Sequence, residues 1–245
     1  MIILGDIGNT ETKICLVNKK KIIKKILIPS KGKKIDILDK HFKKFNFFKI
    51  KKILFCSVVP STFNEIKIYF SKKTKIKCFE LKELDLRSIL RIDVDYKQVG
   101  SDRLANAISV FAKNKNFIIL DFGTATTFDV LIGDNYKGGI ISPGIKLSLN
   151  TLSDKASLIP KINLKKMSKV IGKDTQSAVR SGFFWGYAGL IDNIINLIKK
   201  ETKKSFNIII TGGFSNLFKN SIKTKTKQDL DITINGLNRA LKLIK

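Results

Sequence analysis

Two stretches of the chain combine a carboxylate, a glycine and hydroxyls in a pattern that suits phosphate binding. In each, an apolar run ends on an Asp, one apolar residue and a Gly, followed by polar residues. These stretches are 2–10, with Asp6 and Gly8, and 118–127, with Asp121 and Gly123. Backbone N–H groups and small hydroxyls in such a turn can approach an anion closely, while the Asp holds a cation or a water. An ordinary turn with a capping Asp is the alternative interpretation.

The spacing of the two stretches indicates an internal duplication. Gly8 and Gly123 lie 123 − 8 = 115 positions apart, close to half of the 245 residues. A repeat of this length is typical of a duplicated domain. We therefore predict an N-terminal half, 1–113, and a C-terminal half, 114–245. Each half would supply one turn to a shared cleft, so that the two turns grip the two ends of one phosphate chain.

A third stretch, Gly100-Ser101-Asp102-Arg103, opens a predicted helix that continues to about residue 112. Gly100 allows a substrate to approach the backbone, Asp102 can take a proton from a hydroxyl, and Arg103 can neutralise an anionic group. We expect the helix start and Arg103 to keep Asp102 ionised at neutral pH. A helix cap with a surface ion pair explains the same residues equally well when they are considered in isolation.

The scarcity of histidine indicates that carboxylates carry out any acid–base chemistry. His41 is the only histidine, which nearly excludes histidine-based triads and zinc sites. Cys15, Cys56 and Cys78 are odd in number and lie in apolar surroundings, which indicates reduced core thiols. No stretch approaches the roughly 20 apolar residues of a transmembrane helix, and the N-terminus lacks the features of a signal peptide. We therefore expect a cytoplasmic protein without a membrane partner.

The strongly basic balance raises nucleic acid as a partner, but the residue types argue against it. The chain has 47 basic and 20 acidic residues, for a net charge of +27, and only five of the basic residues are arginines. Base readout and bidentate phosphate contacts favour arginine, and no helix-turn-helix, zinc-finger or aromatic RNA-binding signature is present. We expect lysines spread over solvated faces and no specific nucleic-acid partner.

Apolar runs and helical periodicities alternate along the chain, which predicts an α/β fold. Predicted strands lie at three short runs within 1–30, at 51–59, at 75–79, at 118–132 in a hairpin, at 136–144 and at 206–210. Predicted helices lie at 36–44, at 62–70 with Ser61 as N-cap, at 100–112, at 145–152, at 173–199 and at 234–245. The 173–199 helix contains Gly182, Gly186 and Gly189, which would allow close packing beside Trp185.

In this order and spacing, four motifs resemble the motif set of type III pantothenate kinases. The motifs are Asp6-x-Gly-Asn-Thr10, Gly100-x-Asp-Arg103, Asp121-x-Gly-Thr-Ala-Thr126 and Gly138-Gly-x-Ile-x-Pro-Gly144, and both Gly172-Lys-Asp-Thr175 and Thr211-Gly-Gly213 also fit. The resemblance covers essentially the whole chain. It implies duplicated actin-like, sugar-kinase-like domains of the ASKHA, ribonuclease H-like class, with mixed sheets flanked by helices. It also implies a homodimer that phosphorylates pantothenate to 4′-phosphopantothenate with ATP, the first step of coenzyme A biosynthesis.

The resemblance further implies a role for each matching position. The substrate loop is Gly100, Ser101, Asp102 and Arg103, in which Asp102 accepts the proton, and Thr175 contacts pantothenate across the dimer. Asp121 would hold a monovalent cation, potassium or ammonium, and Thr124 would contact ATP. Asp6 would lie near the metal, the Mg²⁺ that accompanies the nucleotide. The nucleotide-binding segment comprises Asp6, Ile7, Gly8, Asn9, Thr10, Glu11, Thr12 and Lys13.

One departure from the family pattern leaves a role open. The family usually has Asn-Pro, and often a substrate-touching Tyr, before the Gly-x-Asp-Arg loop, whereas this chain has 93–98 without a proline. Tyr96 is therefore left out of the predicted site. Two other functions remain as alternatives: another phosphotransferase or phosphohydrolase of the same fold, and a non-catalytic nucleic-acid-binding regulator.

Overall fold

The computed structural model describes residues 1–19, 21–32, 34–43 and 45–244, and the chain forms two compact units. Unit 1 contains Met1–Phe111, Asp134–Tyr136 and Asp231–Lys245, and unit 2 contains Ala112–Gly133 and Lys137–Leu230. The division after residue 113 that the sequence suggests differs from these units at 112–113, which belong to unit 2, and at 134–136 and 231–245, which belong to unit 1. Each unit is built on one mixed sheet.

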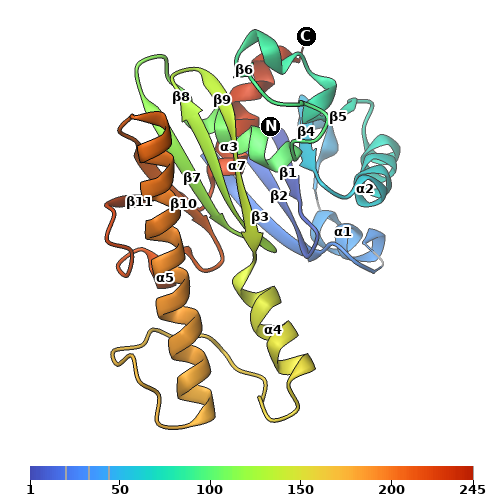
Figure 1. Ribbon diagram of the computed structural model, residues 1–245. Coiled ribbons are helices and arrows are strands. Elements are labelled where there is room, and N and C mark those ends of the chain that lie inside the picture. The colour runs from blue at the N-terminus through green and yellow to red at the C-terminus, as the bar shows by residue number, and fades with distance from the viewer. Residues whose placement is uncertain (20, 33, 44, 245) are drawn as a thin grey trace. The chain divides into compact units, whose positions relative to one another are not determined.

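Unit 1 is built on a five-stranded sheet with β1 at its centre (Figure 1). β2 pairs antiparallel with both β1 and β3, whereas β4 pairs in parallel with both β1 and β5. The order across the sheet is β3-β2-β1-β4-β5. The strands are β1 (Ile2–Ile7), β2 (Glu11–Asn18), β3 (Lys21–Pro29), β4 (Lys52–Ser57) and β5 (Cys78–Glu80).

Helices cover this sheet in two groups. α1 (Ile35–Phe42) and α2 (Pro60–Lys73) bury Phe42 and Phe70 in one core with Ile3, Ile7 and Phe55 of the sheet. α3 (Ser101–Val110) and α7 (Ile232–Ala240) pack on each other and on β1 and β4. Because successive side chains of a strand point to opposite faces, Ile3 and Ile7 face α1 and α2, and Asp6 faces the other side. The pleat of β1 therefore directs Asp6 to the face that α3 and α7 cover.

Unit 2 is built on a second mixed sheet, with β7 at its centre. α5 (Thr175–Thr202) buries Phe184, Ile191 and Ile195 against Leu120 and Ile210 of this sheet. α4 (Ile145–Lys155) and the short α6 (Ser215–Phe218) also belong to this unit. The strands are β7 (Asn116–Phe122), β8 (Ala125–Ile132), β9 (Asn135–Pro143, whose first two residues belong to unit 1), β10 (Asn207–Gly212) and β11 (Thr226–Gln228).

The two sheets repeat one topology, which confirms the predicted duplication. The order β3-β2-β1-β4-β5 in the first corresponds to β9-β8-β7-β10-β11 in the second. The pairing directions also correspond: β1/β2 and β7/β8 are antiparallel, and β1/β4 and β7/β10 are parallel. β6 (Arg91–Ile92) is an addition that pairs with Asn135 and Tyr136 of β9. Each central strand ends at one of the two Asp-x-Gly turns.

The predicted helices and strands are present, with shifted ends. α2 begins at Pro60 with Val59 as N-cap, so the prediction of Ser61 as N-cap is wrong. Proline suits the first helical position because it has no N–H to satisfy there and its φ is already helical. The unassigned region 80–96 contains the 3-10 turns η2 (Leu81–Glu83) and η3 (Leu86–Ser88) together with β6, and η4 (Leu241–Leu243) follows α7. Residues 44 and 245, the predicted ends of two helices, lie outside the described residues.

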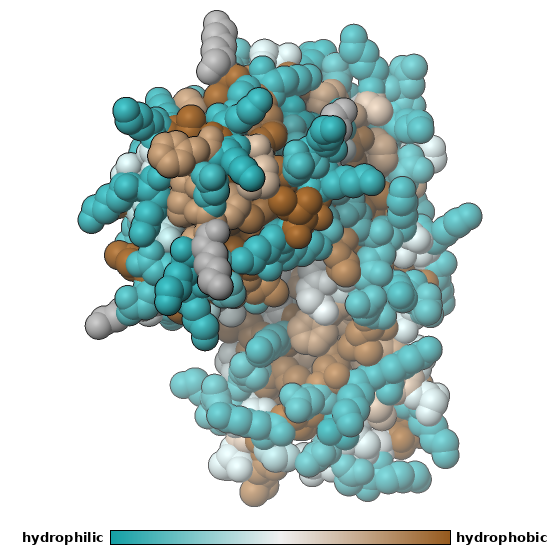
Figure 2. Space-filling model, turned by 180° about the vertical axis from the view of Figure 1, so that it is seen from behind, coloured by the Kyte–Doolittle hydropathy of each residue, from teal (hydrophilic) through white to brown (hydrophobic). Residues whose placement is uncertain are grey.

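The surface and the cysteines agree with the composition. Figure 2 shows hydrophilic side chains projecting from all parts of the visible face, with apolar patches between them. The three cysteines are free and buried, as predicted. In the described part of the chain, no helix combines the length and apolar character needed to cross a bilayer.

Candidate active site

Both predicted turns are closed by a hydrogen bond from the glycine that follows the Asp. The N–H of Gly8 donates to the carbonyl of Glu11 over 3.1 Å, and the N–H of Gly123 donates to the carbonyl of Ala125 over 3.0 Å. A Cβ on Gly8 would lie 3.2 Å from the Glu11 carbonyl, which leaves little room for a side chain. The amides of Gly8 and Gly123 thus maintain the turns, and donors for a bound anion must come from the residues beside them.

Asp6 lies between two strands that supply its nearest partners. It is opposite Lys13 on β2 and beside Cys56 on β4. The thiol of Cys56 donates to Asp6 Oδ1 over 3.5 Å. Burial and the negative charge of Asp102 raise the pKa of Asp6 from 3.8 to about 6, although Lys13 and the Cys56 thiol lower it. Unit 1 therefore brings the first turn and the Gly100 loop into electrostatic contact.

Asp102 lies in the first turn of α3, whose N-cap is Gly100. Its Oδ1 accepts a hydrogen bond from the N–H of Arg103 over 2.8 Å. A Cβ on Gly100 would lie 2.4 Å from the same oxygen, so glycine at this position leaves the carboxylate where it is. Burial raises the pKa of Asp102, while the N–H and the charge of Arg103 lower it. Burial thus acts against the effects of Arg103 and the helix start, and the ionisation of Asp102 at neutral pH stays a prediction.

The segment that leads into Gly100 is fixed by Lys82 and Tyr96. The ammonium of Lys82 donates to the carbonyls of Lys97 and Val99, both over 3.1 Å. The hydroxyl of Tyr96 donates to the carbonyl of Lys82 over 3.2 Å, and the Lys82 ammonium lies 5.0 Å from the centre of the Tyr96 ring. The role left open for Tyr96 therefore includes a structural contact to the loop.

Glu80 belongs to the same region, and the sequence analysis missed it. Its carboxylate accepts hydrogen bonds from the N–H of Ser57 over 3.2 Å, from the N–H of Lys82 over 2.6 Å and from the hydroxyl of Ser101. The Lys82 bond is local, because Glu80 is the N-cap of η2, whereas Ser57 and Ser101 lie on segments that only the fold brings to Glu80. No local pattern around Glu80 marks it, because its partners at 57 and 101 are distant in the sequence.

In unit 2, Asp121 lies on the face of β7 opposite to α5. Leu120 and Phe122, its neighbours on the strand, belong to the core beneath α5, so the pleat directs Asp121 away from that helix. Glycines surround it closely: a Cβ on Gly212, whose φ is +82°, would lie 2.5 Å from Asp121 Oδ1. A Cβ on Gly144 would lie 2.0 Å from the carbonyl oxygen of Thr124. The glycines predicted from sequence thus allow other parts of the backbone to approach the second turn.

The cation predicted at Asp121 fits oxygen donors of this kind. One carboxylate and the carbonyls of Gly123 and Thr124 belong to the same turn, and hard cations bind carboxylate and carbonyl oxygens. Among the described residues there is no group of three or more His, Cys, Asp or Glu able to hold a metal ion. Mg²⁺ is commonly held by one or two carboxylates together with substrate phosphates, and the carboxylate of Asp6, with the charge of Asp102 acting on it, suits that mode.

Thr175 lies apart from the second turn, at the start of α5. Its neighbour Asp174 is the N-cap and forms a capping box with Ser177, and Thr175 is exposed. Gly172 packs on this first helical turn, since a Cβ there would lie 2.3 Å from the N of Ala178. In Figure 1 this end of α5 extends beyond the strands of its own sheet. Unit 2 therefore does not bring Thr175 to Asp121.

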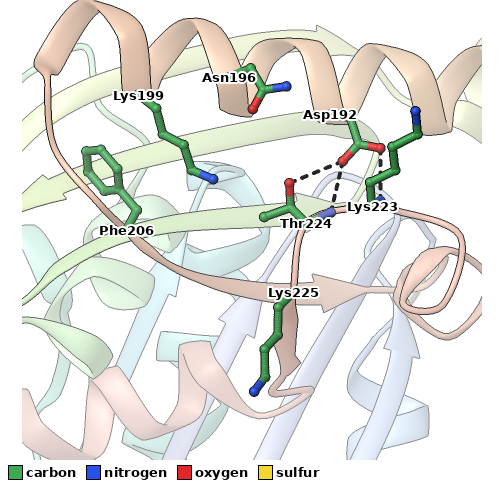
Figure 3. Close-up of a pocket in the computed structure, with 7 residues that line it drawn as sticks. All are labelled: Asp192, Asn196, Lys199, Phe206, Lys223, Thr224 and Lys225. Carbon is green, nitrogen blue, oxygen red and sulfur yellow. Dashed lines mark hydrogen bonds between the residues drawn. The ribbon is translucent and has the colours of Figure 1, made fainter.

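A cavity of about 400 Å³ in unit 2 contains none of the predicted site residues (Figure 3). It lies where β10 and β11 begin, whereas Asp121 lies where β7 ends. Within it, the carboxylate of Asp192 accepts hydrogen bonds from the N–H of Lys223 and from both the N–H and the hydroxyl of Thr224, over 3.0 to 3.2 Å. In Figure 3 the side chains of Lys223 and Lys225 extend in different directions, so the cavity does not focus their charge on one anion.

Comparison with known proteins identifies relatives over the whole chain. The family model described as type III pantothenate kinase matches residues 2–197. A type III pantothenate kinase from Pelagibacter ubique (strain HTCC1062) is 66% identical over 248 residues, and the match covers 100% of both chains.

Solved structures share the fold at low sequence identity. A Baf family protein from Campylobacter jejuni has a TM-score of 0.65 at 19% identity, with 98% of this chain and 97% of that chain covered. An ROK hexokinase from Thermus thermophilus has a TM-score of 0.51 at 10% identity, with 100% and 99% covered. These likenesses, together with the repeated topology, confirm the predicted sugar-kinase-like fold.

The raised pKa of Asp6 predicts a cost in stability. Between about pH 4 and pH 6 the folded state binds more protons at Asp6 than the unfolded state, so its contribution to stability falls as the pH rises through this window. We expect Asp6→Asn to match the wild type near pH 4 and to exceed its free energy of unfolding by about 1–3 kcal/mol at pH 7. Urea unfolding without nucleotide measures this difference. The exposed Asp154→Asn serves as control, and a difference independent of pH would contradict the prediction.

Proposed function

The chain belongs to the type III pantothenate kinase family, and from this premise we propose how its residues carry out the reaction. It transfers a phosphoryl group from ATP to pantothenate and forms 4′-phosphopantothenate, the first step of coenzyme A biosynthesis. The observation that supports our assignment of roles is the electrostatic contact between Asp102, at the start of α3, and Asp6, in the first turn. It joins a candidate base and a candidate phosphate-binding turn within one unit.

Asp102 is the proposed general base, and it takes the proton of the 4′-hydroxyl of pantothenate as phosphoryl transfer proceeds. Its pKa is raised by burial, which makes the carboxylate a stronger proton acceptor than an exposed one. Arg103 is the proposed anion partner, because an arginine can neutralise the pantothenate carboxylate or the charge that develops during transfer. Gly100 and Ser101 are proposed to form the part of the substrate loop that precedes Asp102.

The nucleotide is proposed to bind the first turn, from Asp6 through Lys13, and to contact Thr124 of the second turn. Phosphoryl transfer asks the protein mainly to position the reactants and to neutralise charge. Mg²⁺ bound with the nucleotide would neutralise charge on the phosphates beside Asp6. Asp121 is the proposed ligand of a monovalent cation, potassium or ammonium, with backbone carbonyls of its own turn as further oxygen donors.

We further propose that the protein is a homodimer, in which Thr175 of each chain contacts pantothenate bound to the other. Gly182, Trp185, Gly186 and Gly189 recur at helical spacing on one side of α5. Apart from adjacent residues and the nearby backbone of α5 itself, no atom of the described chain lies within 4 Å of a Cβ built on any of the three glycines, and Trp185 is 37% exposed. Glycines inside a helix cost about 1 kcal/mol each relative to alanine, so their stripe suits a close approach by a second chain.

The location and the basic surface complete the proposal. A cytoplasmic location agrees with ATP as phosphoryl donor and with three reduced cysteines. The basic surface is proposed to have no specific nucleic-acid partner, because only five of its 47 basic residues are arginines.

Replacement of the base gives the central test. We expect Asp102→Asn to lower kcat by roughly 10²- to 10⁴-fold with little change in ATP affinity, because proton acceptance is lost while the nucleotide contacts remain. Arg103→Ala should instead raise the KM for pantothenate. Coupled ADP-release assays with and without pantothenate measure both effects. Turnover by Asp102→Asn within about threefold of the wild type would transfer the base assignment to Asp6.

The cation proposal predicts dependence on potassium or ammonium. Sodium should substitute poorly, because its smaller radius and tighter hydration do not match a site suited to potassium. Asp121→Asn should weaken ATP binding and reduce the difference between potassium and sodium buffers. Initial rates at matched ionic strength measure this, and equal wild-type rates in the two buffers would remove the cation from the site.

The dimer proposal predicts twice the mass of one chain by light scattering. Gly186→Leu should give monomers, because the added side chain blocks close approach, although leucine itself favours the helix. The monomer should also lose saturation by pantothenate if Thr175 acts across the interface. Asn196→Leu, further along α5 at the cavity of Figure 3, is the control and should remain dimeric. An active wild-type monomer would refute both the assembly and the role of Thr175.

A further inference from the structure

Glu80 connects three segments that surround the Gly100 loop. Its Oε1 accepts hydrogen bonds from the N–H of Ser57 and the hydroxyl of Ser101, and its Oε2 accepts one from the N–H of Lys82. Ser57 ends β4, Lys82 lies in η2, and Ser101 is the first residue of α3. One carboxylate thereby ties the start of α3 to the end of β4 and to the 3-10 turn that follows β5.

The bond to Ser101 replaces the usual means of fixing a helix start. An N-cap side chain commonly accepts a hydrogen bond from the first helical turn, but the N-cap of α3 is Gly100, which has no side chain. A side chain at this position would require the Asp102 carboxylate to move, because its Cβ would meet Asp102 Oδ1. Ser101 is only 2% exposed, and its hydroxyl donates to Glu80 from within the helix start. The anchor for α3 therefore comes from outside the helix.

The same region holds the chain on the other side of Gly100. Lys82, whose N–H donates to Glu80, uses its ammonium to hold the carbonyls of Lys97 and Val99. Glu80 thus fixes Ser101, the residue after Gly100, by a direct hydrogen bond. It also fixes the backbone of Lys82, whose ammonium holds the chain before Gly100. Asp102 and Arg103 follow immediately, so a shift of this anchor displaces both side chains.

We propose that Glu80 is a positioning residue for phosphoryl transfer, which directs Asp102 and Arg103 through its bond to Ser101. The inference rests on the proposed function, in which Asp102 is the base and Arg103 binds the anion. A carboxylate is required because all three partners are donors, and it alone offers two accepting oxygens. A glutamine offers one oxygen, so its amide nitrogen must face at least one of the three donors.

Glu80→Gln should separate the kinetic constants. We expect kcat to fall on the order of tenfold or more and the KM for pantothenate to rise several-fold, since small displacements of positioning groups are costly in the transition state. The KM for ATP should stay within twofold. The matched control is Glu83→Gln, which makes the same change three residues later, at the end of η2, at an exposed residue paired with Lys67 over 3.9 Å. This control should keep wild-type constants.

Ser101→Ala tests the same contact if Glu80→Gln folds poorly. It removes only one hydroxyl, and it should change kcat and the pantothenate KM in the same directions. A double variant that combines Ser101→Ala with Glu80→Ala should lose no more than Glu80→Ala alone, because Glu80→Ala removes both accepting oxygens and leaves Ser101 no bond to Glu80 to lose. Thermal unfolding of all variants shows whether a variant is partly unfolded or is folded with displaced side chains. Partial unfolding lowers the concentration of active sites and leaves both KM values unchanged.

The outcomes distinguish this inference from the proposal beneath it. If Asp102→Asn is impaired but Glu80→Gln and Ser101→Ala both stay within twofold of Glu83→Gln, the positioning role is overturned and the base assignment stands. Independent, multiplicative losses in the double variant would likewise refute an action of Glu80 through Ser101. If Asp102→Asn itself retains near wild-type turnover, the base assignment fails, and this inference fails with it.

Discussion

Side chains on a β-strand alternate between its faces, and this alternation decides where the carboxylates of Asp6 and Asp121 lie. Each Asp lies near the end of a central strand, and apolar residues of the same strand are buried in a core. Ile3 and Ile7 pack against α1 and α2, and Leu120 and Phe122 pack against α5. The cores therefore leave each Asp only the opposite face. In unit 1 that face is covered by α3 and α7, so the packing that stabilises the sheet also brings Asp6 toward Asp102.

This arrangement places two carboxylates where solvent is scarce. Burial raises the pKa of both, and the charge of Asp102 raises that of Asp6 further, so the folded protein alone holds an excess of negative charge near the turn. A site of this kind lowers the stability of the protein but suits a kinase. The metal bound with the nucleotide is attracted to negatively charged groups, and a carboxylate can accept the proton of a substrate hydroxyl. Lys13 and the Cys56 thiol relieve the excess only in part.

The glycines of the motifs show a second constraint, which is close approach of the backbone. A side chain at Gly144 would overlap the carbonyl oxygen of Thr124, and one at Gly172 would overlap the first turn of α5. Gly212 requires glycine for two reasons: its φ is positive, and a side chain there would overlap Asp121. Gly182, Gly186 and Gly189 are different, because the described chain leaves open space around them. Glycines of this chain therefore serve turns, internal packing and, on α5, a surface that we propose a second chain covers.

The sequence by itself determined the longer elements and the two Asp-x-Gly turns, because strand, helix and turn propensities act between residues close in the chain, but it did not predict the short β6, α6 and β11. It also determined the duplication, since a repeated pattern at 115 positions is visible without coordinates. It placed the N-cap of α2 at Ser61 rather than Val59, because serine is a favoured N-cap and valine is not, although Pro60 suits the first helical position. Only the tertiary structure decided the role of Glu80 and the raised pKa of Asp102. Both depend on burial and on partners from distant segments, and neither burial nor such proximity is encoded in local sequence.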